Sequence, residues 1–433
     1  MSVGLQRLRE DAVGLRDGAA AKGEDPAVVD AAVALDERRR ALLGESDGLK
    51  AERNVASKRI GERIRDGVDA RGAEVTALRT ASTTLGERID RLATELATVE
   101  RDLEECLLRI PNPPDPGVPV GGEEASVIVR TWGEPASHAD GWTRRPHWEV
   151  ADGLGMFDLA AGSKVTGSGW PIYRGHGAAL QRALIDFMID LQSREHGMIE
   201  IWPPAVINAA SARGTGQIPD KEDQMYVLER DELYLVPTAE VPVTNIHRDE
   251  IIDADRLPIR YVAYSPCFRR EAGAAGRDTR GILRVHQFDK VEMVLFERPD
   301  RSDEALEWLT GCAEAVLRRL ELPYRVKLMA TRDMGFVQAK KYDVEVWAPG
   351  VERWLEVSSV SNFRDYQARR MNIRWRPETG ARPEILHTLN GSALGMARTV
   401  AALLEVYQRP DGALSVPEVL QRRLGAQTFE PPA

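Results

Sequence analysis

Cysteine and histidine are scarce in this sequence, and their spacing excludes several kinds of site. The chain has 433 residues, of which three are cysteines and seven are histidines. Cys106, Cys267 and Cys312 lie far apart, so the sequence predicts neither a disulfide framework nor a zinc site. No apolar run reaches the roughly 18 residues that a membrane span needs, and no secretory signal is present. We therefore expect a soluble cytoplasmic protein with no membrane partner.

The common glycine-rich nucleotide motifs are also missing. There is no GxxxxGK[ST] loop, no GxGxxG that opens a helix, and no HExxH or CxxC metal motif. A nucleotide would therefore be held by side chains on a sheet, and not by a glycine loop at a helix N-terminus. The net charge of −10 argues against a generally basic nucleic-acid-binding surface, although local patches decide binding.

Two long helices are predicted near the N-terminus. Apolar residues recur every seven positions between Val75 and Ile110, and Leu35, Leu42 and Leu49 keep the same period upstream. The stretch RDGVDARG separates them, which predicts an antiparallel hairpin about 50 Å long at about 1.5 Å per residue. Basic residues toward its tip form a candidate phosphate-contacting patch, with a solvated coiled-coil face as the alternative. The patch comprises Lys50, Arg53, Lys58, Arg59 and Arg63.

The proline-rich stretch RIPNPPDPGVPVGGEE ends the second helix. It divides the chain into an N-terminal helical arm, residues 1–112, and a second domain, residues 113–433. One long amphipathic helix and short strands follow, and several of the strands are joined by loops too short or too irregular to hold a crossover helix. The sequence therefore predicts an α+β fold, with an antiparallel sheet flanked by helices.

The stretch CFRREAGAAGRDTRGILRVHQFDKVE, residues 267–292, is predicted as strand, glycine-rich loop, strand. Alternation along the second strand places five polar or aromatic residues on one face, namely Arg284, His286, Phe288, Lys290 and Glu292. Such a face offers a guanidinium to a phosphate, an aromatic ring to a base and a carboxylate to an ammonium. The alternative is a wet sheet face with scattered ion pairs.

Seven stretches in order, together with one long helix, resemble the class II aminoacyl-tRNA synthetases, in the form found in seryl-tRNA synthetases. Residues 267–292 resemble motif 2, HTLNGSALGMARTVAALLE resembles motif 3, and the long helix into Pro203-Pro204 resembles motif 1, the dimerisation element. The other stretches are IPNPPDPGVPVG, GTGQIPD, LVPTAEVP, KKYDVEVWAP and EVSSVSNFRDYQARR. The resemblance covers nearly the whole chain and implies a homodimer whose helical hairpin binds tRNA.

The resemblance implies that L-serine is activated with ATP to seryl-adenylate and transferred to the 3′ end of tRNA(Ser), and of tRNA(Sec) where present. A carboxylate is already an adequate nucleophile, so attack on the α-phosphate needs positioning and charge neutralisation but no general base. The residues implied to be catalytic are Arg269, Arg398 and Glu356.

The resemblance implies a separate role for each residue of the ATP site. Arg269 and Arg398 would clamp the phosphates, Glu271 would hold the adenine amino group, and Phe288 would stack on the ring. Glu356 and Ser359 match the family's Mg²⁺-holding positions, whose oxygen atoms suit that ion; zinc is not expected. The full implied ATP-binding set is Arg269, Arg270, Glu271, Arg284, Phe288, Glu356, Val357, Ser358, Ser359 and Arg398.

The implied serine site lies in other motifs. Glu292 would pair with the α-ammonium, while Glu240 and Ser392 would test the side-chain hydroxyl. Buried groups that demand a hydroxyl partner reject alanine, because alanine leaves them unpaired. The full implied serine-binding set is Thr238, Ala239, Glu240, Arg269, Glu292 and Ser392.

A few positions depart from the family pattern. Val360 stands where the family has cysteine, Arg332 where it has glycine, and Ala397 where glycine is usual, while Trp170-Pro171 is uncommon. Val360 is expected beside the serine pocket, and these pocket-side changes raise the hypothesis of a second copy that is insensitive to a serine-adenylate-like antibiotic or dedicated to a biosynthetic pathway. A housekeeping enzyme is the plain alternative. An aminoacyl carrier-protein ligase and a non-catalytic synthetase-like binding protein also remain open.

Overall fold

The computed structural model describes residues 3–135, 141–272 and 280–432. The chain forms two compact units. The first comprises Met1–Ala20 and Glu24–Pro111, and the second comprises Ala21–Gly23 and Asn112–Ala433. None of the helices in the described ranges is both long and apolar enough to cross a membrane.

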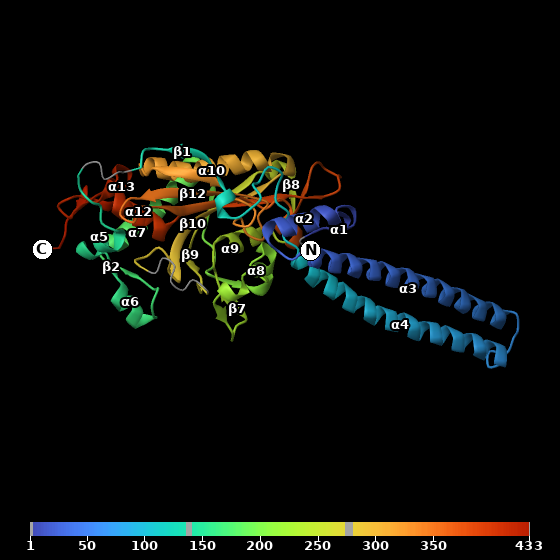
Figure 1. The fold of residues 1–433 in the computed structure, drawn as a ribbon. Helices are drawn as coiled ribbons and strands as arrows, with labels where there is room; N and C mark the ends of the chain where they lie inside the picture. The colour runs from blue at the N-terminus through green and yellow to red at the C-terminus, as the bar shows by residue number, and fades with distance from the viewer. Residues whose placement is uncertain (1–2, 136–140, 273–279, 433) are drawn as a thin grey trace. The chain divides into compact units, whose positions relative to one another are not determined.

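The first unit is the predicted helical hairpin. The short helices α1 (Leu5–Glu10) and α2 (Ala12–Lys22) precede α3 (Ala27–Arg65) and α4 (Ala73–Leu108), which lie side by side along their length (Figure 1). The heptad residues form the apolar seam between α3 and α4, with Leu42, Leu49, Ile89, Leu92 and Val99 buried in it. The seven-residue period therefore predicted both the helices and their packing.

The second unit is built on an eight-stranded sheet in the order β1-β11-β12-β13-β16-β10-β9-β4. All neighbouring pairs are antiparallel except β4 with β9. The strands are β1 (Val127–Trp132), β4 (Ile199–Ile201), β9 (Ile259–Phe268), β10 (Gln287–Glu297), β11 (Tyr324–Leu328), β12 (Lys340–Ala348), β13 (Arg353–Asn362) and β16 (His387–Gly395). The predicted α+β class is confirmed.

Both faces of this sheet are covered. Helices α7 (His176–Asp190), α10 (Ser302–Arg319) and α12 (Met396–Tyr407) share the main apolar core with one face, to which Val291 and Met293 of β10 contribute. Alternate residues of the same strand, Val294 and Phe296, enter a second cluster on the other face. Figure 1 shows α10 and α12 lying along the sheet.

Shorter elements complete the second unit. The helices are α5 (His147–Gly153), α6 (Leu159–Val165), α8 (Ala209–Thr215), α9 (Glu240–Thr244), α11 (Tyr366–Arg370) and α13 (Glu418–Leu424). The strands are β2 (Phe157–Asp158), β3 (Ile172–Tyr173), β5 (Val206–Asn208), β6 (Val227–Leu228), β7 (Leu233–Leu235), β8 (Ile251–Asp253), β14 (Arg374–Arg376), β15 (Glu384–Ile385), β17 (Leu414–Ser415) and β18 (Thr428–Phe429).

The predicted alternation is wrong for His286, which lies just before β10 and does not share the face of Phe288 and Glu292. Its ring instead stacks on Trp170, with centroids 5.6 Å apart, and its Nδ1 lies 3.1 Å from the carbonyl oxygen of Arg269. The uncommon Trp170 is therefore a packing partner of this turn. The glycine-rich loop predicted before it lies largely outside the described residues.

Candidate active site

A cavity of about 520 Å³ opens in the second unit. Strands β10, β13 and β16 contribute to its walls, together with residues that precede α9 and residues that precede β12. Most of the site residues expected from the sequence line it, namely Thr238, Glu240, Arg269, Glu271, Arg284, Phe288, Glu292, Glu356, Val357, Ser358, Ser359, Ser392 and Arg398.

Two of the expected residues do not line this cavity. The Arg270 side chain is exposed, and its Nη1 donates to the carbonyl oxygen of Asp223 at 3.4 Å. Ala239 is fully buried in the second apolar cluster, which also contains Val294 and Phe296. Neither side chain is in position to contact a ligand in the cavity, because one points to solvent and the other is covered.

Glu292 and Ser392 are direct neighbours on adjacent strands. Val291 of β10 pairs with Leu394 of β16, but Glu292 pairs with Ser392, so Ala393 is an extra residue at this point. Such a bulge shifts the alternation of one strand relative to the other. It thereby places the Glu292 carboxylate and the Ser392 hydroxyl on the cavity side together.

Lys290 completes a polar triangle with Glu292 and Thr238. The Lys290 ammonium forms an ion pair with Glu292 and donates to the Thr238 hydroxyl at 2.8 Å. That hydroxyl in turn donates to Glu292 Oε2 at 3.1 Å. The sequence placed Lys290 on the correct strand face but not among the ligand-binding residues. Its position indicates that it balances part of the negative charge in this corner.

Glu240 is a second carboxylate in the same cavity. It is the first residue of α9, and the side-chain amide of Gln367 donates to its Oε1 at 2.7 Å. Burial raises the pKa of the Glu240 carboxyl above its ordinary value, and the Glu292 carboxylate raises it further. Two carboxylates therefore face one region, where Lys290 and Lys221 offset part of their negative charge. Their oxygens can accept hydrogen bonds from an ammonium or a hydroxyl of a ligand.

Aromatic and guanidinium groups form another wall. The Arg269 guanidinium carbon lies 5.1 Å from the centroid of the Phe288 ring, within cation–π range. Arg284 forms an ion pair with Glu271, whose φ of 51° lies in the left-handed region. A flat ring under one guanidinium group, in a cavity that Arg284 also lines, suits a base with attached phosphates.

A second bulge arranges Glu356 and Ser359. Ser358 pairs with Val344 on β12, whereas Glu356 pairs with Glu345, so Val357 is the extra residue. Glu356 and Ser359 are three residues apart and would face opposite sides of a regular strand. Because the bulge resets the alternation, both side chains reach the cavity.

Positive charge surrounds Glu356. Arg398 Nη1 donates to the backbone oxygen of Glu356 at 3.0 Å and to its Oε2 at 3.3 Å. Burial alone would raise the pKa of Glu356, but the charges of Lys341, Arg398 and Arg269 outweigh it and hold the pKa below its ordinary value. The carboxylate is therefore ionised near neutral pH, as a metal ligand must be.

The donor set fits a hard cation that also binds phosphate. Within the described ranges, no group of three or more His, Cys, Asp or Glu side chains could enclose a metal by itself. Glu356 and Ser359 provide one carboxylate and one hydroxyl. That small oxygen set suits Mg²⁺, which protein sites hold through one or two carboxylates together with substrate phosphates and water.

One wall of the cavity is a loop held from behind by Lys22. Asp333, Met334, Gly335, Val337 and Gln338 line the cavity. The Lys22 ammonium donates to the backbone oxygens of Gly335, Phe336 and Gln338 at 2.8, 3.0 and 2.6 Å. Lys22 belongs to the stretch Ala21–Gly23, which groups with the second unit. No local pattern in the sequence predicts this contact.

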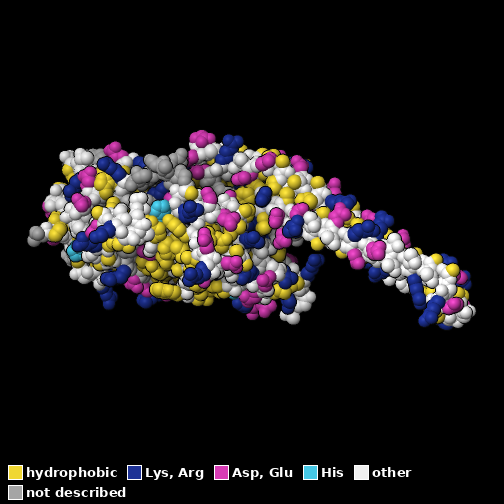
Figure 2. Space-filling model, turned by 90° about the horizontal axis from the view of Figure 1, so that it is seen from below, with side chains coloured by type: hydrophobic (Ala, Val, Ile, Leu, Met, Phe, Trp, Pro, Cys, Tyr) yellow, Lys and Arg dark blue, Asp and Glu magenta, His cyan; other side chains and the backbone are white. Residues whose placement is uncertain are grey.

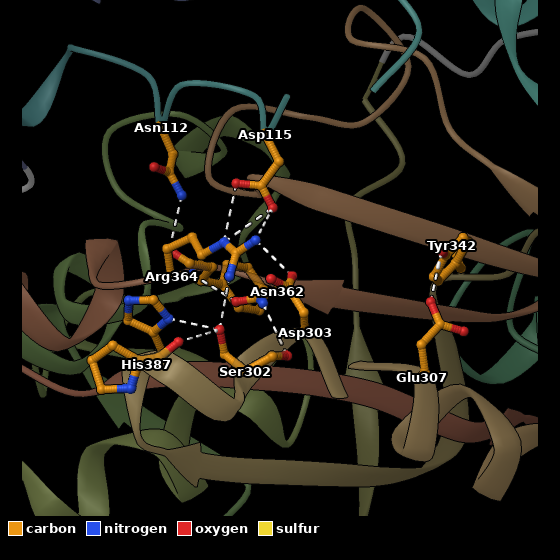
Figure 3. Close-up of polar contacts among 11 residues, drawn as sticks. Asn112, Asp115, Ser302, Asp303, Glu307, Tyr342, Asn362, Arg364 and His387 are labelled. Atoms are coloured by element: carbon orange, nitrogen blue, oxygen red, sulfur yellow. Dashed lines mark hydrogen bonds and ion pairs between the residues drawn. The ribbon is translucent and has the colours of Figure 1, made fainter. Parts of the chain in front are cut away.

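A polar network near residue 112 supports the same loop (Figure 3). Asn112 Nδ2 donates to the backbone oxygens of Val337 and Phe363 at 3.0 and 2.9 Å. Next to it, the Arg364 guanidinium bonds to the carboxylates of Asp115 and Asp303. Arg364 Nη1 also donates to the Ser302 hydroxyl at 2.8 Å, and that hydroxyl lies 2.8 Å from His387 Nδ1. These bonds fix the start of the second unit against the sheet.

The departures from the family pattern have different positions from those expected. Val360 is fully buried in the main core, and it does not line the cavity. Arg332 is exposed and does not line it either. Val360 points away because Ser359 and Ser361, its neighbours on the strand, face the cavity. Of these substitutions, Ala397 is the one that reaches the cavity wall.

Comparison with protein-family models covers both units. A model of the seryl-tRNA synthetase N-terminal domain matches residues 4–114. A model of the tRNA synthetase class II core domain (G, H, P, S and T) matches residues 226–407.

Individual proteins resemble the chain over its whole length. A serine-tRNA ligase from Thermomicrobium roseum is 54% identical over 402 residues, which are 93% of this chain and 88% of the relative. The seryl-tRNA synthetase of Pyrococcus horikoshii, solved complexed with ATP, superposes with a TM-score of 0.93 at 36% identity over 100% of both chains. The cytoplasmic serine-tRNA ligase of Naegleria fowleri in complex with AMP superposes with a TM-score of 0.87 at 28% identity, over 98% of this chain and 97% of the other.

Proposed function

Because this chain belongs to the serine-tRNA ligases, a family of class II aminoacyl-tRNA synthetases, we propose that it activates L-serine with ATP and transfers serine to the 3′ end of tRNA(Ser). Where a cell contains tRNA(Sec), the same reaction serves that tRNA. The observation that carries the proposal is a single cavity, shared by the two facing carboxylates and by the guanidinium groups around Phe288.

The serine end of the cavity selects its ligand by charge and by hydrogen bonding. Glu292 pairs with the α-ammonium, and Lys290 offsets part of the remaining negative charge. Glu240 and Ser392 face the side-chain hydroxyl. An amino acid without a hydroxyl leaves these groups without that partner, which is a strong form of rejection.

Activation is a displacement at the α-phosphorus. One carboxylate oxygen of serine forms a bond to phosphorus, the bond to the bridging oxygen of pyrophosphate breaks, and its electron pair leaves with pyrophosphate. Arg269 and Arg398 hold the phosphates and offset the charge that develops on them. Phe288 stacks on the adenine, and Glu271 accepts from its amino group. Positioning supplies the remaining effect, since no proton has to be removed from the nucleophile.

Glu356 and Ser359 would hold Mg²⁺ against the phosphates. When bound, the ion neutralises charge on the pyrophosphate leaving group. Arg398 keeps the Glu356 carboxylate oriented through bonds to both its backbone and side-chain oxygens.

The helical hairpin is the proposed tRNA-binding arm. All five candidate cations lie on α3, and three of them pair with acidic residues of the same unit: Lys50 with Asp47, Lys58 with Glu62, and Arg63 with Glu74. Ion pairs this exposed are worth about 0–1 kcal/mol. Phosphates of a tRNA can therefore replace the acidic partners at little cost.

We also propose a cytoplasmic homodimer. The segment that resembles motif 1 leaves large apolar side chains exposed, with Ile199 60% and Trp202 78% accessible. A broad apolar area is visible on one face of the second unit (Figure 2). Exposed apolar patches of this kind mark protein interfaces.

Two assays separate the proposal from its alternatives. Amino-acid-dependent ATP–pyrophosphate exchange tests activation, and charging of total tRNA tests transfer. Serine-dependent exchange with charging supports the proposed reaction. Exchange without charging would indicate a carrier-protein acceptor, and no exchange with any amino acid would indicate a binding protein. Retention of Arg269, Glu292, Glu356 and Arg398 in one cavity disfavours the last outcome.

A further inference from the structure

Gln367 is a buried amide directly behind the cavity. It lies on α11 with a relative exposure of 1%, and it does not line the cavity itself. Its Nε2 donates to Glu240 Oε1 at 2.7 Å and to the backbone oxygen of Thr215 at 3.2 Å. Its Oε1 accepts from the Thr388 hydroxyl at 2.8 Å.

These partners determine how the amide is oriented. The Thr215 carbonyl can only accept, so it requires the NH₂ group on its side. Reversing the amide would place its oxygen against that carbonyl and against the Glu240 carboxylate. Thr388 and Thr215 are both fully buried, so water cannot substitute for the lost bonds without rearrangement. The Gln367 NH₂ group is therefore aimed at Glu240 by the fold.

The Gln367 amide that donates to Glu240 is neutral, so it does not cancel the charge of the Glu240 carboxylate. In the described part of the chain, Gln367 is the one side chain that donates to the Glu240 carboxylate, through one of its two oxygens. A lysine or arginine in its place would cancel the charge of Glu240 and compete with a ligand. The amide instead fixes the carboxylate while leaving Oε2 and the negative charge for the cavity.

We propose that Gln367 is a positioning residue for hydroxyl recognition: it holds Glu240 so that Oε2 accepts from the side-chain hydroxyl of the amino acid substrate. The inference deepens the proposed function and rests on it. Thr388 has a supporting role, because its hydroxyl fixes the orientation of the amide. Gln367 touches no substrate atom, so its loss alters serine recognition and leaves ATP recognition intact.

Gln367→Met tests the bond to Glu240 with little change in side-chain volume. In serine-dependent ATP–pyrophosphate exchange, the KM for serine rises about tenfold or more, because a hydrogen bond to a charged group is lost. The KM for ATP stays within about twofold. The preference for serine over alanine, measured as a ratio of kcat/KM, falls about tenfold, because the hydroxyl acceptor is no longer fixed.

Gln367→Glu adds a readout that a purely structural role would not produce. The new carboxyl faces Glu240, and two adjacent carboxylates cannot both ionise without a cost. When one of them is protonated, the bond is retained. As pH rises, ionisation of both carboxyl groups forces Glu240 away, so the KM for serine increases with pH relative to wild type.

Two variants of Thr388 test whether its hydroxyl orients the Gln367 amide, and a variant of Arg369 is the control. Thr388→Val removes the outer hydroxyl and produces a smaller shift in the same direction, while Thr388→Ser keeps the hydroxyl and behaves like wild type. Arg369→Ala, on the same helix, removes a bond to Asp365 and serves as the control, with unchanged kinetics. Circular dichroism melting of each variant separates recognition from misfolding.

The outcomes are distinct. The inference is overturned if Gln367→Met and Gln367→Glu leave the KM for serine and the serine-to-alanine ratio unchanged. It is equally overturned if the KM for ATP rises in parallel, which would indicate a general structural defect. If Gln367→Met fails to fold, the inference is tested by the pH profile of Gln367→Glu and by the KM for serine of the two Thr388 variants. A wild-type protein without serine-dependent exchange would instead defeat the proposed function itself.

Discussion

Glu292 and Ser392 face each other across β10 and β16, where an extra residue in β16 brings them into register. Without that bulge, Glu292 would be opposite Ala393 and the Ser392 side chain would point to the other face of the sheet. The pairing places an anionic group and a hydroxyl next to each other at the cavity wall. It is the geometric basis of the proposed serine site.

Glu292→Gln removes the negative charge that pairs with the substrate ammonium in the proposed serine site. We expect kcat/KM for serine in pyrophosphate exchange to fall about a hundredfold, corresponding to a charged hydrogen bond of about 2–3 kcal/mol. The KM for ATP should remain close to wild type. Glu297→Gln, farther along the same strand, is the matched control and should keep normal activity. Equal losses in both variants would contradict a role for Glu292 in serine binding.

Lys22→Met removes three bonds to the loop that forms one cavity wall. Because each bond comes from a charged donor, we expect unfolding free energy to fall by about 1–3 kcal/mol. Hydrogen exchange of the amides between Gly335 and Gln338 should accelerate, and the KM for substrates should rise. Lys164→Met, at an exposed position in the last turn of α6, should change none of these quantities. Unchanged exchange in the loop would show that Lys22 does not restrain it.

His387 makes stability depend on pH. Burial lowers the pKa of His387 to about 4, whereas an unfolded chain has about 6.5. Between these values the unfolded state binds the proton and the folded state does not, so stability is complete above about pH 6.5 and falls as pH drops toward 4. The loss is at most about 3 kcal/mol. In urea unfolding of His387→Asn, the free energy of unfolding should depend less on pH across this window. An unchanged slope would show that His387 is not the source of the pH dependence.

Val360→Cys and Arg332→Gly restore the residues expected of the family. Neither native side chain lines the cavity, so inhibition by a seryl-adenylate mimic should stay within about twofold of wild type. Val360→Cys should lower stability by about 1 kcal/mol, because the smaller side chain leaves a gap against Gly391 in the main core. A large gain in inhibitor potency would revive the hypothesis of an antibiotic-insensitive copy.

Local patterns in the sequence predicted the elements and most of the site. The heptads of α3 and α4 carry their own packing partners, so they predict the hairpin without further information. Motif resemblance assigned Glu292, Arg398 and Ser359 to a ligand site, and the structure brings them into one cavity. The proposed roles of these residues stay predictions until they are measured.

Other features depend on contacts that no local pattern encodes. The bulges at Val357 and Ala393 are set by pairing between distant strands, so the reason that Glu356 and Ser359 share a face was not visible. Gln367 reaches Glu240 from 127 residues away, and Lys22 reaches Gly335 from 313 residues away. Val360 lies on a strand that lines the cavity but faces the main core, so its place in the motif did not predict its contacts.

The central claim is that one cavity selects serine and joins it to AMP. It is tested most directly by ATP–pyrophosphate exchange with the purified protein and each of the common amino acids in separate reactions. We predict exchange with serine that exceeds the rate with alanine or threonine by at least about a hundredfold. Exchange that is equally fast with alanine, or that requires a different amino acid, would contradict the account.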